Sequence, residues 1–125
     1  MGLVLIVDDE VGIAKLLEEV LQDEGHRTTL AANGKQALDR VTVERPDVII
    51  TDFMMPVMDG PAMVAVLKAD PTTKDVPVIV VSSLPEITVK ERCPGVALVL
   101  RKPFNIFELA DKVADMLRAG GDAEG

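Results

Sequence analysis

The chain has 125 residues, 48% of them hydrophobic, a single cysteine and a formal net charge of −8 at pH 7. A chain of this length forms one domain that can bury a core without disulfides, and one cysteine agrees with a reducing compartment. The negative charge argues against direct nucleic-acid binding, and no apolar run approaches the roughly 18 residues of a membrane span, so we expect a cytoplasmic protein without membrane insertion.

Five short runs rich in Val, Ile and Leu predict five β-strands. In chain order they are Leu3–Val7, Thr28–Ala32, Val48–Thr51, Val78–Val81 and Val96–Leu100. Helical spacing or helix-start signals occupy the segments that follow them, at Val11–Glu24, Lys35–Val43, Pro61–Ala69, Glu86–Arg92 and Asn105–Arg118. Strands that alternate with helices indicate an α/β fold, with a parallel sheet covered on both faces.

The last two helices have distinctive ends. The fourth is expected to be short, because Pro85 precedes it and Pro94 follows it. The fifth begins at a predicted Asn105 N-cap and is expected to end before Gly120. We therefore predict one domain over residues 1–118 and a short flexible tail over residues 119–125.

Polar side chains follow four of the five predicted strands at the point where each strand ends. In an open α/β sheet, ligands bind beyond the carboxyl ends of the strands, so these residues are expected to share one edge. They are Asp8, Asp9 and Glu10 after the first strand, Asp52 after the third, Ser82 after the fourth and Lys102 after the fifth.

This combination of side chains suits phosphoryl transfer. Neighbouring carboxylates repel one another, but a hard dication such as Mg²⁺ makes the cluster tolerable and leaves coordination positions for phosphate oxygens. Lys102 can pair with Asp52 or with a phosphoryl group, and Ser82 can donate a hydrogen bond to a phosphoryl oxygen. A carboxylate can itself serve as the covalent acceptor.

Each of these residues also has an ordinary structural explanation. Acidic residues favour the positive end of a helix, aspartates are common in turns, serines often cap helices, and most lysines are solvated surface charges. The coincidence of all of them at one sheet edge favours a functional site.

Four segments, "LIVDDE", "VIITDFMMPVMDG", "VPVIVVSS" and "RKPF", together resemble the receiver domain of two-component response regulators. The resemblance extends from Met1 to about Leu117. It implies a flavodoxin-like, doubly wound (βα)5 three-layer sandwich, with a five-stranded parallel sheet in the order 2-1-3-4-5 and, here, a shortened fourth helix.

The resemblance also implies a metal site. Asp9 and Asp52 would ligate Mg²⁺, together with the backbone carbonyl of Met54, and Asp8 would act through a bound water. Mg²⁺ is thus the expected cofactor.

The same resemblance implies the reaction. Asp52 would accept a phosphoryl group from a sensor histidine kinase or a histidine phosphotransfer protein, with Lys102 binding the phosphate and Ser82 as the switch hydroxyl. The Lys102–Pro103 peptide is expected to be cis, as it typically is in the family. Output would then come from altered contacts with a downstream protein, in a switch that modifies only itself and is not an enzyme acting on other substrates.

Three features depart from the family pattern. The position three residues before Lys102, usually aromatic, is Val99. The fourth helix is short, on a face that many receivers use for output. Met54 stands two residues after Asp52, where polar residues are common, and we hypothesise that it slows the loss of phosphate by limiting water attack.

Three other functions compete with this prediction. A degenerate receiver would bind partners constitutively, without phosphorylation. A Mg²⁺-dependent aspartyl phosphatase or phosphotransferase would usually carry a second Asp two residues after the nucleophile, where this chain has Met54. A flavodoxin-like cofactor protein would need aromatic planes, but the chain has three Phe and no Tyr or Trp.

Overall fold

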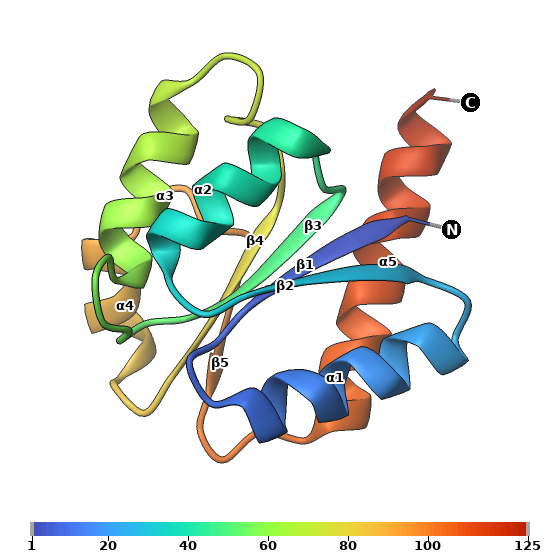
Figure 1. Cartoon of the computed structure of the whole chain (residues 1–125), viewed down its shortest axis with the longest axis horizontal. Coiled ribbons are helices and arrows are strands. Elements are labelled where there is room, and N and C mark those ends of the chain that lie inside the picture. The colour runs from blue at the N-terminus through green and yellow to red at the C-terminus, as the bar shows by residue number, and fades with distance from the viewer. Residues whose placement is uncertain (1, 125) are drawn as a thin grey trace.

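The computed structural model describes residues 2–124, with side chains described through residue 119. Five strands alternate with five helices and build three layers, with the sheet in the middle (Figure 1). The strands are β1 Leu3–Val7, β2 Arg27–Ala31, β3 Val48–Asp52, β4 Val78–Ser82 and β5 Leu98–Arg101. The helices are α1 Val11–Asp23, α2 Gly34–Val43, α3 Gly60–Ala69, α4 Glu86–Arg92 and α5 Ile106–Glu124.

The strands pair in parallel in the order β2-β1-β3-β4-β5, which confirms the implied order. Helices α1 and α5 cover one face, and α2, α3 and α4 cover the other (Figure 1). In the register, Val7 lies opposite Thr51, and Asp52 lies opposite Val81. The carboxyl ends of β1, β3 and β4 therefore meet side by side at one edge of the sheet.

The three central strands are buried along their whole length. Successive side chains point to opposite faces, so Ile6 and Ile50 pack toward α1 and α5, while Leu5 and Ile49 pack toward α2, α3 and α4. Burial of one such side chain stabilises the fold by about 1.5–3 kcal/mol. This two-sided burial explains the nearly continuous Val/Ile/Leu runs of the sequence.

Side-chain caps start three of the helices. Asn33 Oδ1 accepts a hydrogen bond from Gln36 N, and Asp59 Oδ1 accepts one from Ala62 N. The predicted Asn105 cap is confirmed, because its Oδ1 accepts from two backbone N–H groups of the first turn of α5. Each cap satisfies N–H groups that lack an intrahelical partner, which defines where the helix begins.

The two edge strands differ from their predicted bounds. Strand β2 lies one residue earlier than expected, and β5 begins at Leu98 instead of Val96. The turn before β5 delays its start, because Gly95 has a left-handed φ of 87°. Strands at an edge bury less of their surface, so their sequence pattern marks their ends weakly.

The fourth helix has the predicted bounds, whereas the fifth does not. We expected the fifth helix to end at Arg118 and residues 119–125 to form a tail, but α5 continues to Glu124. The prediction relied on Gly120 and Gly121 as a stop. Glycine inside a helix costs only about 1 kcal/mol relative to alanine, which does not by itself end a helix. Gly125 lies outside the described residues.

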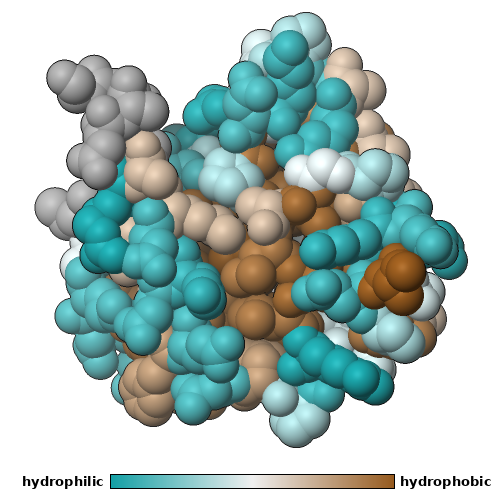
Figure 2. Space-filling view, turned by 180° about the vertical axis from the view of Figure 1, so that it is seen from behind, coloured by the Kyte–Doolittle hydropathy of each residue, from teal (hydrophilic) through white to brown (hydrophobic). Residues whose placement is uncertain are grey.

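The surface seen from behind carries an apolar band between hydrophilic regions (Figure 2). The band lies between α5 and α4, where the edge strand β5 approaches the surface and Leu98 and Leu100 are only partly buried. Among the described residues, no helix combines the length and hydropathy needed to cross a membrane.

Candidate functional site

Three aspartates gather at the carboxyl edge of the sheet. Asp8 and Asp9 follow β1, Asp52 ends β3, and one carboxylate oxygen from each lies within 4.8 Å of the others. Asp52 is buried, Asp8 is partly buried and Asp9 is exposed. The parallel pairing of β1 with β3 brings these residues together, as the sequence predicted.

Lys102 reaches this cluster from the other side of β4. Its Nζ lies 2.9 Å from Asp52 Oδ1, and its backbone N–H donates to the carbonyl of Ser82. Partial burial by itself lowers the pKa of Lys102, but the hydrogen bond to Asp52 and the charges of Asp52 and Asp8 outweigh it and leave that pKa raised. The Lys102–Pro103 peptide is cis, as expected.

The two oxygens of Asp52 have different surroundings. Oδ1 accepts a hydrogen bond from the backbone N–H of Phe53 at 3.1 Å and also pairs with Lys102. Among the described residues, no hydrogen bond to Oδ2 accompanies the one that Oδ1 accepts. One oxygen is therefore held in place, while the other keeps its lone pairs for a metal or an incoming group.

The three aspartates carry more negative charge than the ammonium of Lys102 can neutralise. Burial raises the pKa of Asp8, the backbone hydrogen bond from Glu10 opposes this shift, and the charge of Asp52 adds to it. The raised pKa means that the folded protein disfavours the ionised form of Asp8. A cation bound among the three aspartates would relieve this cost.

The remaining predicted residues lie around the cluster. Ser82 ends β4, is buried, and accepts a hydrogen bond on Oγ from Leu84 N at 3.0 Å. Met54 lies in the loop after β3, with its side chain 73% exposed. Val99 is buried on β5. Ser82 and Met54 thus follow or end the two central strands whose carboxyl ends meet at this edge.

Sequence reasoning missed two residues that shape the site. Phe53 supplies the N–H that holds Asp52, and its carbonyl accepts a hydrogen bond from Gly60 N at 2.9 Å. A Cβ on Gly60 would lie 2.7 Å from the Asp52 carbonyl oxygen, so a larger residue would displace the acceptor strand. The Asp59-Gly60 pair, a common turn signal, could have indicated this close approach.

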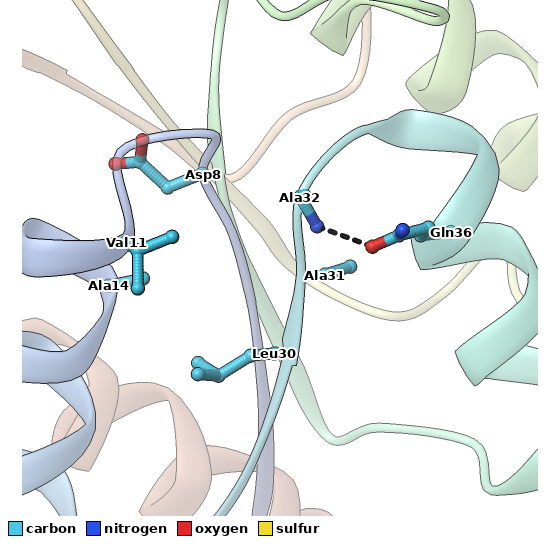
Figure 3. A pocket seen from close by; sticks show the side chains of 7 residues that line it. All are labelled: Asp8, Val11, Ala14, Leu30, Ala31, Ala32 and Gln36. Atoms are coloured by element: carbon cyan, nitrogen blue, oxygen red, sulfur yellow. Dashed lines mark hydrogen bonds between the residues drawn. The ribbon is translucent and has the colours of Figure 1, made fainter.

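A pocket adjoins the cluster on the side of β2 (Figure 3). Its volume is about 170 Å³, and Asp8 is the charged residue among those that line it. Val11 and Ala14 contribute from α1 and Leu30 from β2. The apolar walls supply no ligands for an anion, so the polar chemistry of the site belongs to the region between Asp8 and Lys102.

These geometric relationships define what the site can do chemically. The aspartates offer hard oxygen ligands, which fit Mg²⁺ and not a metal that prefers sulfur or imidazole. A buried carboxylate with one free oxygen, beside an ammonium, suits covalent acceptance of a phosphoryl group.

Comparison with known sequences agrees with this chemistry. A family model described as the response regulator receiver domain matches residues 4–114. Sporulation initiation phosphotransferase F of Bacillus subtilis is 40% identical over 116 residues, which cover 91% of this chain and 92% of that protein. The transcriptional regulatory protein PrrA of Mycobacterium tuberculosis is 38% identical over 94% of this chain. The chain spans about half of that longer regulator, 51% of its length.

Solved structures show the same architecture. The signal receiver domain of a signal transduction histidine kinase from Syntrophus aciditrophicus superposes with a TM-score of 0.87 at 34% identity, covering 95% of this chain and 92% of that one. The chemotaxis response regulator CheY4 of Vibrio cholerae superposes with a TM-score of 0.85 at 32% identity, covering 93% of this chain and 98% of that one.

Proposed function

The chain belongs to the family of response regulator receiver domains, and on this premise we propose that Asp52 is its phosphoacceptor. Membership places the chain in two-component signalling as a phosphoacceptor module and not as a true enzyme. It also implies a histidine kinase or a histidine phosphotransfer protein as partner. The observation that carries the proposal is the buried Asp52 carboxylate, held through Oδ1 beside Lys102 and two further aspartates.

In the proposed reaction, Asp52 Oδ2 attacks the phosphorus of a phosphohistidine. The P–O bond forms while the P–N bond breaks, the electrons of that bond leave with the imidazole nitrogen, and this nitrogen takes up a proton. Lys102 neutralises charge on the phosphoryl oxygens, and Ser82 donates a hydrogen bond to one of them. The engagement of Oδ1 by Phe53 and Lys102 supports Oδ2 as the nucleophilic oxygen.

Mg²⁺ is the proposed cofactor. Its ligands would be Asp9, Asp52 and the backbone carbonyl of Met54, with Asp8 acting through a water. When bound, Mg²⁺ would offset the negative charge shared by the carboxylates and the phosphoryl oxygens. The oxygen donors gathered within 4.8 Å and the raised pKa of Asp8 support this assignment.

Mass spectrometry of the intact protein tests the proposal after incubation with acetyl phosphate and Mg²⁺. The wild type should gain a single phosphoryl adduct that EDTA prevents, and Asp52→Asn should gain none. Asp39→Asn, which removes an exposed carboxylate of α2, is the matched control and should be phosphorylated like the wild type. An adduct that persists in Asp52→Asn would overturn the assignment.

A phosphohistidine-bearing donor protein provides the second arm of this experiment. A wild type that accepts phosphate from neither acetyl phosphate nor such a donor would favour the alternative of a degenerate receiver that binds partners constitutively. Turnover of phosphomonoesters by the wild type would instead favour an aspartyl phosphatase.

A further inference from the structure

Phe53 connects the proposed acceptor to the core beneath α4. Its backbone N–H donates both to Asp52 Oδ1 and to the carbonyl of Val81 in the neighbouring strand. Its ring is 6% exposed and packs in the same core cluster as Val89 and Cys93, at the end of α4. Phe53 thus contacts Asp52 Oδ1 through its backbone and belongs to the core cluster beneath α4 through its ring.

Arg92 lies over the Phe53 ring. It is the last residue of α4, and its guanidinium carbon lies 5.8 Å from the centroid of the Phe53 ring. This distance is within the range of a cation–π contact. The opposite end of α4 is also connected to the site, because the loop before it is held by the hydrogen bond from Leu84 N to Ser82 Oγ.

The position usually occupied by the family's aromatic switch residue is unsuited to that role here. Val99 is 7% exposed and packs in the core cluster that contains Phe53. A β-branched aliphatic side chain has few rotamers and carries no ring that could turn between buried and exposed positions. The residue that directly follows the proposed acceptor is, however, aromatic: Phe53.

We infer that the contact between Phe53 and Arg92 couples the phosphorylation state of Asp52 to the position of α4. The inference rests on the proposed function. When Oδ2 is esterified, Oδ1 becomes the carbonyl oxygen of an acyl phosphate and loses its negative charge, so it accepts more weakly from Phe53 N and no longer pairs with Lys102. The Phe53 backbone then relaxes, and its ring carries the change to Arg92.

Such coupling is reciprocal. Phosphorylation of Asp52 would strengthen the binding of a protein that recognises α4 in its shifted position. Binding of that protein would in turn shift the phosphorylation equilibrium of Asp52 by the same factor. The short α4 is thereby the element that reports the state of the site.

Cys93 provides a natural reporter for the test. It is the single cysteine of the chain, follows Arg92 directly and is 1% exposed. Burial raises the pKa of its thiol to about 11, so the thiol reacts slowly until the end of α4 moves. The rate of Cys93 labelling by a small disulfide reagent therefore reports movement at this end of the helix.

The experiment measures this labelling rate with Mg²⁺, in the presence and absence of acetyl phosphate, while intact mass monitors the adduct. In the wild type, phosphorylation should change the rate by about two- to fivefold, the factor that a partly exposed cation–π contact represents. In Arg92→Gln the ratio of the two rates should fall to about one, although the adduct still forms. Taking the ratio within each variant removes any effect of Arg92 on the intrinsic reactivity of the thiol.

Two further variants sharpen the test. Arg92→Lys keeps a cation near the ring and should retain the response, whereas Lys90→Gln, which removes a cation paired with Glu86 on the same helix, should respond like the wild type. Because Arg92 and Lys90 are both exposed, the variants are expected to fold.

An unchanged ratio in Arg92→Gln would overturn the inference, as would a ratio of one in fully phosphorylated wild type. Both outcomes would leave the proposed function standing. A wild type that gains no adduct from acetyl phosphate or from a phosphohistidine donor would overturn the proposed function, and this inference with it.

Discussion

Lys102 Nζ lies 2.9 Å from Asp52 Oδ1, although β4 lies between β3, which Asp52 ends, and β5, which Lys102 follows. In this ion pair Lys102 is about one-third exposed and Asp52 is buried. Lys102 therefore serves as the partner of the resting carboxylate and as the proposed partner of the phosphoryl oxygens. Four predictions test how the charges and side chains of this region act.

Lys102→Gln should slow phosphorylation by acetyl phosphate about 10- to 100-fold. The expected loss is smaller than that for an enclosed oxyanion donor, because the ammonium is partly solvated. Mg²⁺ binding should persist or strengthen, since a competing positive charge has been removed. Adduct formation followed over time by mass spectrometry measures the rate, with Lys102→Arg as the variant that keeps the charge. Phosphorylation of Lys102→Gln at the wild-type rate would contradict the assigned role.

Asp8→Asn should stabilise the fold in the absence of Mg²⁺. In the folded protein the pKa of Asp8 is raised above its ordinary value of 3.8. As the pH rises above 3.8, Asp8 therefore ionises more readily in the unfolded chain than in the folded protein, and this difference lowers the free energy of unfolding. We expect a gain of about 0.5–1 kcal/mol in the free energy of unfolding at neutral pH, a modest value because the carboxylate is partly solvated.

Urea denaturation with and without Mg²⁺ measures this effect. Mg²⁺ should stabilise the wild type more than Asp8→Asn, because the substitution removes charge from the proposed metal site. Asp111→Asn, which removes an exposed carboxylate of α5, is the control. It should change neither the free energy of unfolding without Mg²⁺ nor the increase that Mg²⁺ produces. If Asp8→Asn proved less stable than the wild type in EDTA, the repulsion argument would fail.

Met54→Asn should shorten the lifetime of the phosphoryl group several-fold. Met54 stands two residues after Asp52, in the loop that follows β3, and its apolar side chain is exposed. An amide there could hold an attacking water, which the thioether cannot do well. Decay of the adduct after removal of acetyl phosphate measures the lifetime.

Val57→Asn is the matched control for Met54→Asn. It introduces the same side chain in the same loop, at a position that is 78% exposed and has a left-handed φ of 69°, which asparagine tolerates. If Met54→Asn leaves the lifetime unchanged, or if both substitutions shorten it equally, the hypothesis that Met54 limits water attack is wrong.

Ionisation of Cys93 should destabilise the fold at alkaline pH. The pKa of the buried thiol is about 11, against an ordinary value of 9.0, so between these values the unfolded state binds fewer protons than the folded state. The free energy of unfolding therefore falls as the pH rises through this window.

Urea denaturation at pH 8 and pH 10.5 measures this dependence in the wild type and in Cys93→Ala. The wild type should lose about 1–2 kcal/mol more than the variant over this interval. The cost of the cavity in Cys93→Ala is the same at both pH values and cancels in the comparison. Equal losses in the two proteins would show that the thiol does not ionise differently on unfolding.

The sequence by itself determined the alternation of strands and helices and the candidate residues at the strand ends. Short-range periodicity is sufficient for this, because buried parallel strands read as continuous apolar runs and each run ends where the polar residues begin. The bounds of α4 followed from Pro85 and Pro94 in the same local way. The strand order and the individual roles came from the family resemblance, and the order is confirmed by the structure.

Only the tertiary structure decided which atoms meet. The approach of Lys102 to Asp52 Oδ1 and that of Arg92 to the Phe53 ring join residues from different elements, and no local pattern specifies such contacts. The close packing of Gly60 against the Asp52 backbone is of the same kind. Sequence periodicity reports which face of an element is buried, whereas the partner across that face depends on the register and order of the strands. The contacts of Phe53 with Asp52 and with Arg92, on which the proposed coupling rests, could therefore be recognised only in the folded chain.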